Sequence, residues 1–321
     1  MQTEETNVTY DIHPASLDDT AAVVSMFKAP ISVWQRLNAE GRVEDMPYEA
    51  LTLYERWLHG GAWMSVETGA IHLNHLLSGA GLPVVALENG RVVGYAEAYH
   101  SVEALPVGAV LHIAQLVTVS GAVSAADALI SYFVQLAKTL HCRQVTVTRM
   151  DEDPLTAAAE RRAPLKVIGC VKRFTVPART GQVFFRAVEY LDPDPALING
   201  WMMVIGRATS SRHMWERLLP RTWETIPQIR ARKTHRLKFS AAGQEAVVVC
   251  EQGLYNPRSA DVYCWTPKPL TSQLTASIKD WAHRDGYRVL TMLVPEDSIP
   301  MLGSDAEPDG YTQETCALEL N

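Results

Sequence analysis

Residues 91–150 read RVVGYAEAYHSVEALPVGAVLHIAQLVTVSGAVSAADALISYFVQLAKTLHCRQVTVTRM, and the fold of the chain can be predicted outward from them. Arg91–Tyr99 is β-branched and aromatic and follows an Asn-Gly turn, which predicts the second strand of a hairpin. Val110–Val119 is an apolar run of strand length. Ala125–Leu140 has the apolar spacing of a helix, and Gln144–Val147 is typical of a short buried strand.

A loop of small and polar residues, Ser120–Ser124, separates the second strand from the helix. The chain can turn sharply there. A strand that stops at such a loop and opens a helix presents free backbone N–H groups at the positive end of the helix dipole. This arrangement predicts a site for an anion such as a phosphate or pyrophosphate.

Composition narrows the class of protein. The 321 residues suffice for two domains, and 47% hydrophobic and 20% charged residues are ordinary for a soluble globular protein. A net charge of −7 without a basic block argues against a nucleic-acid partner. The five cysteines show no C-x-x-C spacing, so we expect a reducing compartment and no metal site. No apolar run is long enough for a membrane, and no signal segment opens the chain, so we expect a cytoplasmic protein.

The remaining segments extend this pattern on both sides. Before the central stretch we expect a strand over Thr9–His13 and helices over Ser16–Phe27, Pro47–Leu58 and Ala70–Leu77. The first strand of the hairpin follows over Leu82–Leu87. After it we expect a short helix over Leu155–Arg162 and a hairpin of the strands Lys166–Val176 and Gln182–Val188. The fold class is therefore α/β, as an α+β mixed sheet with helices on both faces.

Leu191–Pro195 (LDPDP) is the clearest linker signal in the chain. Beyond it we expect strands over Trp201–Ile205, Glu245–Glu251, Ala260–Trp265, Arg288–Val294 and Tyr311–Leu320. Helices are expected over Ser210–Leu219, Arg221–Arg230 and Thr271–Arg284. Because this order repeats that of residues 83–189, we expect a duplicated domain, with one copy over residues 1–190 and the other over residues 196–321.

Three segments resemble the Gcn5-related N-acetyltransferase (GNAT) family: IHPASLDDTAAVVSMF, VVALENGRVVGYAEAYHS and LHIAQLVTVSGAVSAADALISYFVQLAKTLHCRQVTV. Residues 197–321 resemble a second, degenerate copy through AVVVCEQ, SADVYCWTP and LTSQLTASIKDWAHRDGYRVLTMLVP. The resemblance implies two tandem acyl-CoA N-acyltransferase folds, each open between its two central strands. It further implies that acetyl-CoA, as co-substrate, enters the opening of the first copy.

The resemblance assigns the co-substrate site to the strand and loop of the central stretch. The pantetheine would pair with the strand matched by Gln115–Val119, and the pyrophosphate would lie on the loop and helix start. The implied binding residues are Leu116, Val117, Thr118, Gly121, Ala122, Val123, Ser124, Ala125 and Ala126. The loop lacks the Gln or Arg that leads the family signature Gln/Arg-x-x-Gly-x-Gly/Ala, and residues 155–160 lack the Tyr that often protonates the CoA thiolate. Prolines in Thr266–Thr271 predict no cofactor in the second copy.

Acetyl transfer to an amine needs a general base, which the family usually carries on the two strands before the cofactor loop. Glu97 is one candidate, because alternation puts it on one strand face with Tyr95 and Tyr99. The alternative for Glu97 is an exposed strand residue. His112 is the other candidate, on one face with Ala114 and Leu116, and its alternative is a structural histidine. His100 and Glu103 read as solvated.

The sequence thus predicts an N-acetyltransferase that acts on a small-molecule or peptide amine by direct transfer with Glu97 or His112 as base. The alternative is a catalytically inactive GNAT-like protein that binds acyl-CoA or serves as a structural partner. His72 and His75 have the i, i+3 spacing of two metal ligands, but no third ligand is evident, so no metal is expected. Whether the chain forms a homodimer is left open.

Overall fold

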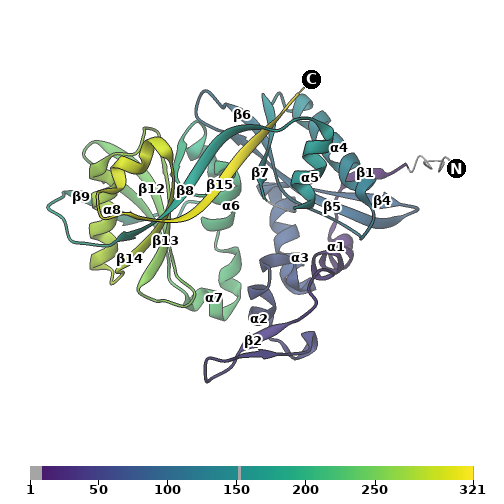
Figure 1. Cartoon of the computed structure of the whole chain (residues 1–321), viewed down its shortest axis with the longest axis horizontal. Helices are drawn as coiled ribbons and strands as arrows, with labels where there is room; N and C mark the ends of the chain where they lie inside the picture. Colours follow the sequence, from purple (N-terminus) through teal and green to yellow (C-terminus); the bar gives the residue numbers. More distant parts are fainter. Residues whose placement is uncertain (1–8, 151–152, 321) are drawn as a thin grey trace.

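A computed structural model describes residues 9–150 and 153–320 of the chain. Residues 1–8, at the start of the first predicted domain, residues 151–152, and residue 321, at the end of the second predicted domain, lie outside the described residues. The chain forms two halves that lie side by side and share one sheet (Figure 1). This sheet has 13 strands in the order β1-β4-β5-β6-β7-β15-β8-β14-β13-β12-β11-β9, and β10 pairs with β13 off this path. The predicted mixed sheet is therefore confirmed.

The first half contains the central stretch and the segments before it. Its strands are β1 (Asp11–Pro14), β4 (Leu82–Glu88), β5 (Arg91–Val102), β6 (Ala109–Thr118), β7 (Gln144–Arg149) and β8 (Lys166–Pro177). Its helices are α1 (Thr20–Lys28), α2 (Leu53–Leu58), α3 (Val66–His75), α4 (Val123–Thr139) and α5 (Pro154–Arg162), with the short helices η1 (Leu17–Asp19), η2 (Tyr48–Ala50), η3 (Gly61–Met64) and η4 (Leu76–Ala80).

The second half repeats this order. Its strands are β9 (Phe185–Glu189), β10 (Met202–Ile205), β11 (Thr234–Ala241), β12 (Gln244–Gln252), β13 (Ser259–Thr266), β14 (Val289–Pro295) and β15 (Glu307–Glu319). Its helices are α6 (Ser211–Leu218), α7 (Pro227–Ala231) and α8 (Ser272–Arg284), with η5 (Pro195–Ile198), η6 (Thr222–Thr225) and η7 (Glu296–Leu302).

The halves exchange one strand each. β15, from the end of the second half, lies between β7 and β8 and pairs antiparallel with both. β8, from the end of the first half, pairs antiparallel with β14. Each half therefore has its central pair of parallel strands followed by a strand that the other half supplies. The predicted division at residues 190 and 196 stays a prediction, because β8, β9 and β15 all pair across it.

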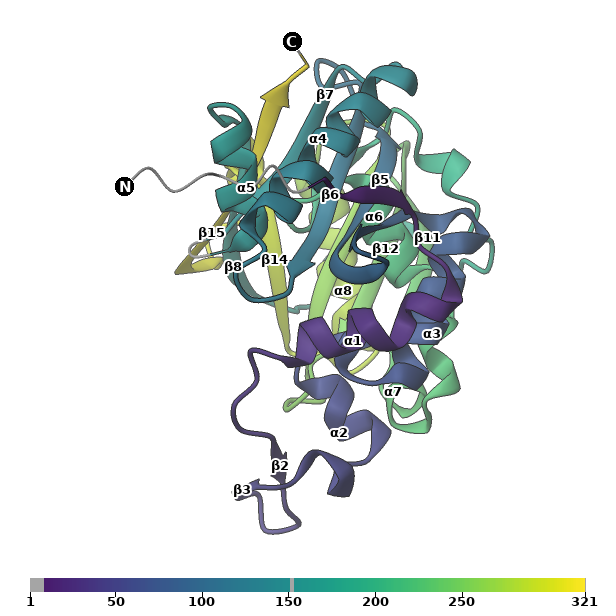
Figure 2. The ribbon, with the colours of Figure 1, turned by 90° about the vertical axis from the view of Figure 1, so that its right-hand side faces the viewer.

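Helices cover both faces of the first half, as Figure 2 shows. α4 and α5 bury one apolar face against the sheet, where Leu129 and Phe133 of α4 contact a cluster that includes Ala96 and Ile113. α1 and α3 cover the other face, where Trp63, Leu73 and Tyr95 are buried. The alternation along β5 separates the two clusters, because successive strand residues point to opposite faces.

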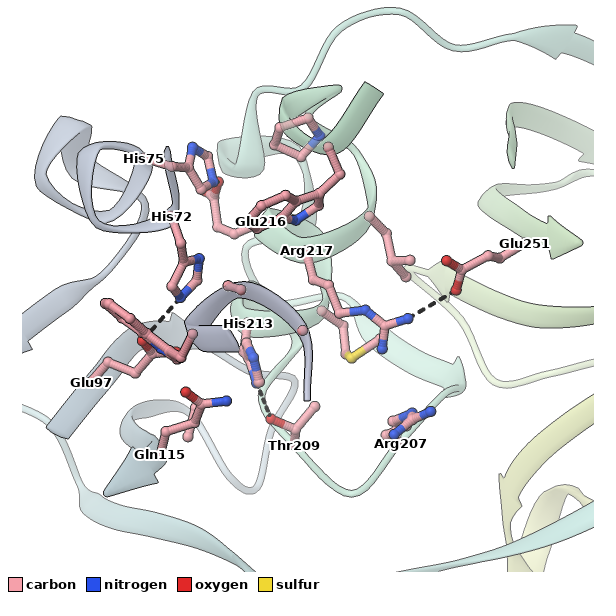
Figure 3. Close-up of a pocket in the computed structure, with 18 of the residues that line it drawn as sticks. His72, His75, Glu97, Gln115, Arg207, Thr209, His213, Glu216, Arg217 and Glu251 are labelled. Carbon is pink, nitrogen blue, oxygen red and sulfur yellow. Dashed lines mark hydrogen bonds and ion pairs between the residues drawn. The ribbon is translucent and has the colours of Figure 1, made fainter. Parts of the chain in front are cut away.

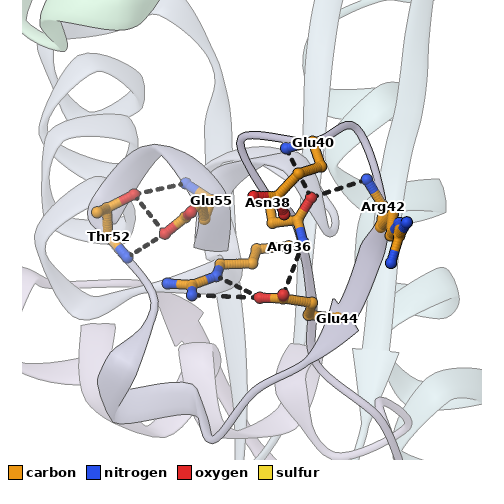
Figure 4. Close-up of polar contacts among 7 residues, drawn as sticks. All are labelled: Arg36, Asn38, Glu40, Arg42, Glu44, Thr52 and Glu55. Carbon is orange, nitrogen blue, oxygen red and sulfur yellow. Dashed lines mark hydrogen bonds and ion pairs between the residues drawn. The ribbon is translucent and has the colours of Figure 1, made fainter.

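A small hairpin, β2 (Gln35–Leu37) and β3 (Val43–Asp45), projects from the first half between α1 and α2 (Figure 1). Polar contacts stabilise the hairpin (Figure 4). Glu44 accepts a 2.7 Å hydrogen bond from Asn38 and forms an ion pair with Arg36. Thr52 and Glu55 form the capping box that begins α2. The backbone N–H of Gln35 donates to His59, which ties the hairpin to the end of α2.

Three expectations are wrong in detail. The strands predicted at Lys166–Val176 and Gln182–Val188 do not form a hairpin, because β8 pairs with β14 and β15 whereas β9 pairs with β11. The helix predicted over Pro47–Leu58 breaks at Leu51, whose ψ of 138° is extended, and restarts after the cap at Thr52. The helix predicted over Arg221–Arg230 divides at Pro227 into η6 and α7. The strand β11 was not predicted.

We expect the two halves to unfold together, because β15 completes the first half from the end of the second. Cys316 is fully buried in β15, between Val147 of β7 and Val167 of β8. We expect Cys316→Asp to lower the free energy of unfolding by about 3 kcal/mol or more, since it buries an unpaired charge. Chemical denaturation should still show one transition. The matched control is Glu319→Gln on the exposed end of β15, and two separate transitions would contradict the coupling.

Candidate active site

The parallel strands β6 and β7 part in the middle of the first half. Their pairing runs from Val110–Gln144 to Ile113–Val147 and ends there. At the same point Ala114 is an extra residue opposite β5, because Glu97 partners Gln115 whereas Ala98 partners Ile113. Such a bulge bends its strand and leaves the extra residue outside the ladder. The bulge at Ala114 therefore turns β6 away from β7.

A cavity of about 780 Å³ lies beside this opening, between the two halves. Ala114 and Gln115 of β6 and Thr148 of β7 line it at the point where the strands part. Figure 3 shows side chains from both halves around it. The first half contributes residues of α2, η3, α3 and β5, and the second half contributes residues of α6, η6, α7, β11 and β12. A cavity of this size between two halves is typical of a binding site.

Glu97 is the most buried carboxylate of the cavity, with 1% exposure. His72 Nε2 lies 3.0 Å from Glu97 Oε2, and the Tyr95 hydroxyl donates to the same oxygen at 2.8 Å. The Tyr99 hydroxyl donates to the other oxygen at 3.3 Å. Tyr95, Glu97 and Tyr99 thus share one strand face, as predicted, and the alternative of an exposed Glu97 is wrong.

These contacts set the ionisation of the group. Burial alone would raise the pKa of Glu97, but the charge and hydrogen bond of His72 and the hydrogen bond of Tyr95 outweigh it and lower that pKa. Burial, followed by the charge of Glu97, raises the pKa of Tyr95 and of Tyr99 well above the usual range. Glu97 is therefore ionised at neutral pH and both phenols are protonated donors.

His72 is the residue of this group that can take up a proton from the cavity. Its Nε2 is directed at the Glu97 carboxylate and carries a proton there, so Nδ1 is the nitrogen that can take up or release a second proton. No residue in the described part of the chain bonds to Nδ1. The ring meets Trp63 edge-on at 5.3 Å and stacks on Trp223 of the second half at 6.1 Å. Figure 3 shows His72 directed at Glu97, with a dashed line that marks their contact.

His112 lies behind this group rather than on the cavity wall. Its Nδ1 lies 3.0 Å from Thr146 Oγ1, and its Nε2 lies 2.8 Å from Thr209 Oγ1 of the second half. Burial, followed by the charge of His213, lowers the pKa of His112 to about 3. The expectation that His112 shares a face with Leu116 is wrong, because the bulge at Ala114 inverts the alternation and puts Leu116 in the core under α4.

The residues implied for the co-substrate form a continuous strand, turn and helix start. Leu116, Val117 and Thr118 lie at the end of β6, past the point where it leaves β7. Gly121 has a φ of +85° with open space around its Cα, which lets the chain turn into α4. Val123–Ala126 form the first turn of α4, and the cap residue Ala122 offers no side-chain bond. The N–H groups of Ala122 and Ala125 bond the carbonyls of Val119 and Ala122, whereas no residue in the described ranges bonds those of Val123 and Ser124. These two N–H groups are available to an anion.

The second copy has the same opening, but its own chain fills it. The parallel pairing of β13 with β14 ends at Val262–Met292. Beyond that point β13 pairs with β10 instead, through Met202–Ile205. The Gly206 N–H then donates to the Leu293 carbonyl of β14 at 2.8 Å. β10 therefore occupies the place in the second copy that corresponds to the opening between β6 and β7.

The segment after β10 brings the second half to the first half's cavity. Thr148 of β7 donates to the Ala208 carbonyl, and the Ala208 N–H donates to Gln313 Oε1 at 3.3 Å. Thr209 Oγ1 contacts both His112 and His213 at 2.8 Å. Sequence patterns did not predict the contacts of this segment with Thr148, His112 and Gln313, because these residues lie about 60 to 105 positions away from it.

The other histidines and acids considered from the sequence have separate roles. His72 and His75 reach different carboxylates, Glu97 and Glu216, rather than a shared metal position. Among the described residues no group of three or more His, Cys, Asp and Glu side chains could hold a metal ion. Glu103 accepts hydrogen bonds from the Ser211 N–H and hydroxyl at 2.8 and 2.7 Å at the start of α6. No helix in the described ranges is long and apolar enough to span a membrane.

The lowered pKa of His112 predicts a pH dependence of stability. In the unfolded chain a histidine binds a proton below a pH of about 6.5, whereas folded His112 does so only near its pKa of about 3. The unfolded state therefore binds more protons between these values, and stability falls as the pH falls. From pH 7.5 to 5.5 one such histidine contributes a loss of about 1.4 kcal/mol.

We expect His112→Gln to remove about this much of the difference in unfolding free energy between pH 7.5 and 5.5, measured by urea denaturation. The exposed His100 provides the control, because His100→Gln should leave the difference as in the unmodified chain. An unchanged pH dependence in His112→Gln would contradict the buried neutral state of His112.

Comparisons with known proteins place the fold. No family model and no curated protein matches the sequence. Solved structures do match: a GCN5-related N-acetyltransferase from Anabaena variabilis has a TM-score of 0.62 at 11% identity, over 98% of this chain and 73% of that chain. A GCN5-related N-acetyltransferase from Kribbella flavida has a TM-score of 0.54 at 12% identity, over 97% and 72%. Eis1 from Mycobacterium abscessus has a TM-score of 0.52 at 14% identity, over 97% and 74%.

At these identities the likeness concerns the fold. It extends over nearly the whole chain, and the strand order repeats in the two halves. The chain therefore has the GNAT fold in two tandem copies, as the resemblance in its sequence implied.

Proposed function

We propose that the chain is an acetyl-CoA-dependent N-acetyltransferase whose first half carries the reaction. The observation that supports this most is the position of the Glu97–His72 pair, which lines the same cavity as the bulged opening between β6 and β7. A base beside a strand opening is what direct transfer from a thioester to an amine requires. Acceptors would be small-molecule or peptide amines, as expected from the sequence.

The first step removes a proton from the acceptor. An ammonium group in the cavity gives its proton to Nδ1 of His72, and Glu97 stabilises the imidazolium through the bond to Nε2. The hydroxyls of Tyr95 and Tyr99 keep the Glu97 carboxylate ionised and oriented. Glu97 would thus orient His72 and stabilise its protonated form, whereas the prediction from sequence made Glu97 the base itself.

The bulge would supply the second requirement, a donor for the carbonyl oxygen. The amine lone pair forms the new C–N bond, the C–S bond breaks, and the thiolate leaves with the electron pair. The backbone N–H at Ala114 stands outside the β5 ladder and can donate to the oxygen as charge develops on it. The thiolate then takes a proton from water, since thiols ionise near pH 8.5 and α5 offers no tyrosine.

The co-substrate would enter from the opposite face of the sheet. Leu116–Thr118 would pair with its extended arm, and the N–H groups of Val123 and Ser124 would hold its pyrophosphate at the positive end of α4. Ala125 and Ala126 are small and buried under the turn, which lets the backbone approach a ligand closely. His112 would act through Thr209 as a structural link between the halves, and its catalytic role stays a prediction.

The alternative is a binding protein that has lost catalysis. It is favoured by the loop 121–126, which lacks the leading Gln or Arg of the family, and by the absence of a tyrosine on α5. Such a protein would bind acyl-CoA without transferring the acyl group. A cytoplasmic location and a homodimer likewise stay predictions.

Titration of the chain with acetyl-CoA tests the first claim. We expect one molecule bound per chain by calorimetry, because β10 fills the second opening. At a concentration 100 times the dissociation constant, binding should stabilise the fold by about 2.7 kcal/mol. Two equivalent sites would contradict the role of β10, and no binding of acetyl-CoA, CoA or longer acyl-CoAs would refute the enzyme and the acyl-CoA-binding alternative together.

Release of the CoA thiol in the presence of a panel of amines tests the second claim. We expect Glu97→Gln and His72→Ala each to lower kcat/KM by about 100-fold or more, with acetyl-CoA binding unchanged. His100→Ala, an exposed histidine at the end of the same strand, is the matched control and should retain full activity. Retention of half the activity in both site variants would refute the assignment, whereas binding without release in the unmodified chain would support the inactive alternative.

A further inference from the structure

Four arginines of the second half line the cavity. They are Arg207 in the segment after β10, Arg217 of α6, Arg232 after α7 and Arg236 of β11. Figure 3 shows Glu97 and His72 on one side of the cavity and Arg207, Arg217 and Glu251 on the other, with His213 between them. The cavity therefore has an acidic end in the first half and a basic end in the second.

The carboxylates of the second half that contact these arginines do not neutralise all of the positive charge of the arginines. Arg236 pairs with Glu224 at 2.9 Å. Arg217 and Arg232 both pair with Glu251, at 2.9 and 2.8 Å, so two guanidinium groups share one carboxylate. Partly enclosed charges are screened less than charges on an open surface, so this excess acts on whatever enters the cavity.

Arg207 has no partner at all within the described ranges. Its guanidinium makes no hydrogen bond, ion pair or ring contact there, although it lines the cavity. Asp261 of β13 lies close enough for the Arg207 charge to lower its pKa, but burial and the charge of Glu251 raise that pKa more, and no ion pair joins the two side chains. Arg207 thus offers its fork of N–H donors to the cavity.

The backbone around Arg207 is held firmly, in contrast to its free side chain. The Gly206 N–H donates to Leu293, Thr148 donates to the Ala208 carbonyl, and Thr209 bridges His112 and His213. The side chain of Arg207 is exposed, so only its side-chain torsions, and not the backbone, must be ordered when its planar fork binds a ligand. This distinguishes Arg207 from an arginine on a loose surface loop.

From these observations we infer that the acceptor is an amine that also carries an anionic group, a carboxylate or a phosphate. The inference rests on the proposed function and names its substrate class. The amine lies against His72 and Glu97, and the anionic group receives the fork of Arg207, with the shared charge of Arg217 and Arg232 behind it. The second half thereby selects the substrate that the first half acetylates.

Binding of product analogues tests the anion site without any requirement for catalysis. The probes are N-acetylglycine, N-acetylleucine and N-acetylphenylalanine, each as the free acid and as the neutral primary amide, followed by thermal unfolding. We expect the free acids to bind the unmodified chain about 10- to 100-fold more tightly than the amides. Arg207→Ala should remove this preference, and Arg186→Ala on the exposed face of β9 should keep it.

Equal binding of acids and amides by the unmodified chain, or a preference that survives Arg207→Ala, would overturn the inference. A third measurement separates it from an effect on the co-substrate, which also carries phosphates. The affinity of Arg207→Ala for acetyl-CoA should equal that of the unmodified chain. A loss of about tenfold or more in that affinity would assign Arg207 to the co-substrate and overturn the inference as well.

Kinetics with amine acceptors complete the test. With glycine, leucine and phenylalanine as free acids and as amides, Arg207→Ala should lower kcat/KM for the acids by about 10- to 100-fold and leave the amides within about twofold. If the amides are acetylated as well as the acids, the inference fails and the proposed function stands. If no amine is acetylated but the free acids still bind through Arg207, the proposed function fails and the anion site stands.

Discussion

The exchange of β8 and β15 is the constraint on which the rest of the molecule depends. β15 lies between β7 and β8, and β8 in turn pairs with β14, so one sheet runs through both copies. The hydrogen bonds of these two central strands therefore fix the angle and distance between the halves. This is why a cavity between them can have a defined shape, and why Thr209 of one half can bond His112 of the other.

The two copies use the same strand opening in different ways. In the first copy the bulge at Ala114 turns β6 from β7, and the opening faces a cavity with a buried carboxylate. In the second copy β10 pairs into the opening. After β10 the chain continues through Gly206–Thr209 to the first copy's cavity. The segment that closes the opening of the second copy thus contributes residues to the cavity of the first copy. Duplication thus yields one composite cavity, with the proposed base in one half and the arginines in the other.

The sequence predicts local features well and contacts between distant segments poorly. Periodicity and turn residues located the strands and the helix of residues 91–150, and alternation put Glu97 with Tyr95 and Tyr99. One inserted residue, Ala114, reversed the alternation for His112 and Leu116, and no local pattern marks such a bulge. From the sequence His72 was considered only for a metal site, which was not expected, because its partner Glu97 lies 25 positions away on another element. No sequence pattern marked Arg207 as a site residue, because its position in the fold depends on where β10 pairs.

A crystal structure of the chain with CoA and an N-acetyl amino acid tests the composite site most directly. We expect the extended arm of CoA between β6 and β7 beyond Ile113 and Val147, with the acetyl group near Ala114 and the carboxylate at Arg207. We also expect β10 unmoved between β13 and β14. CoA bound between β13 and β14, with β10 displaced, or an acetyl group remote from Glu97 and His72, would contradict the account.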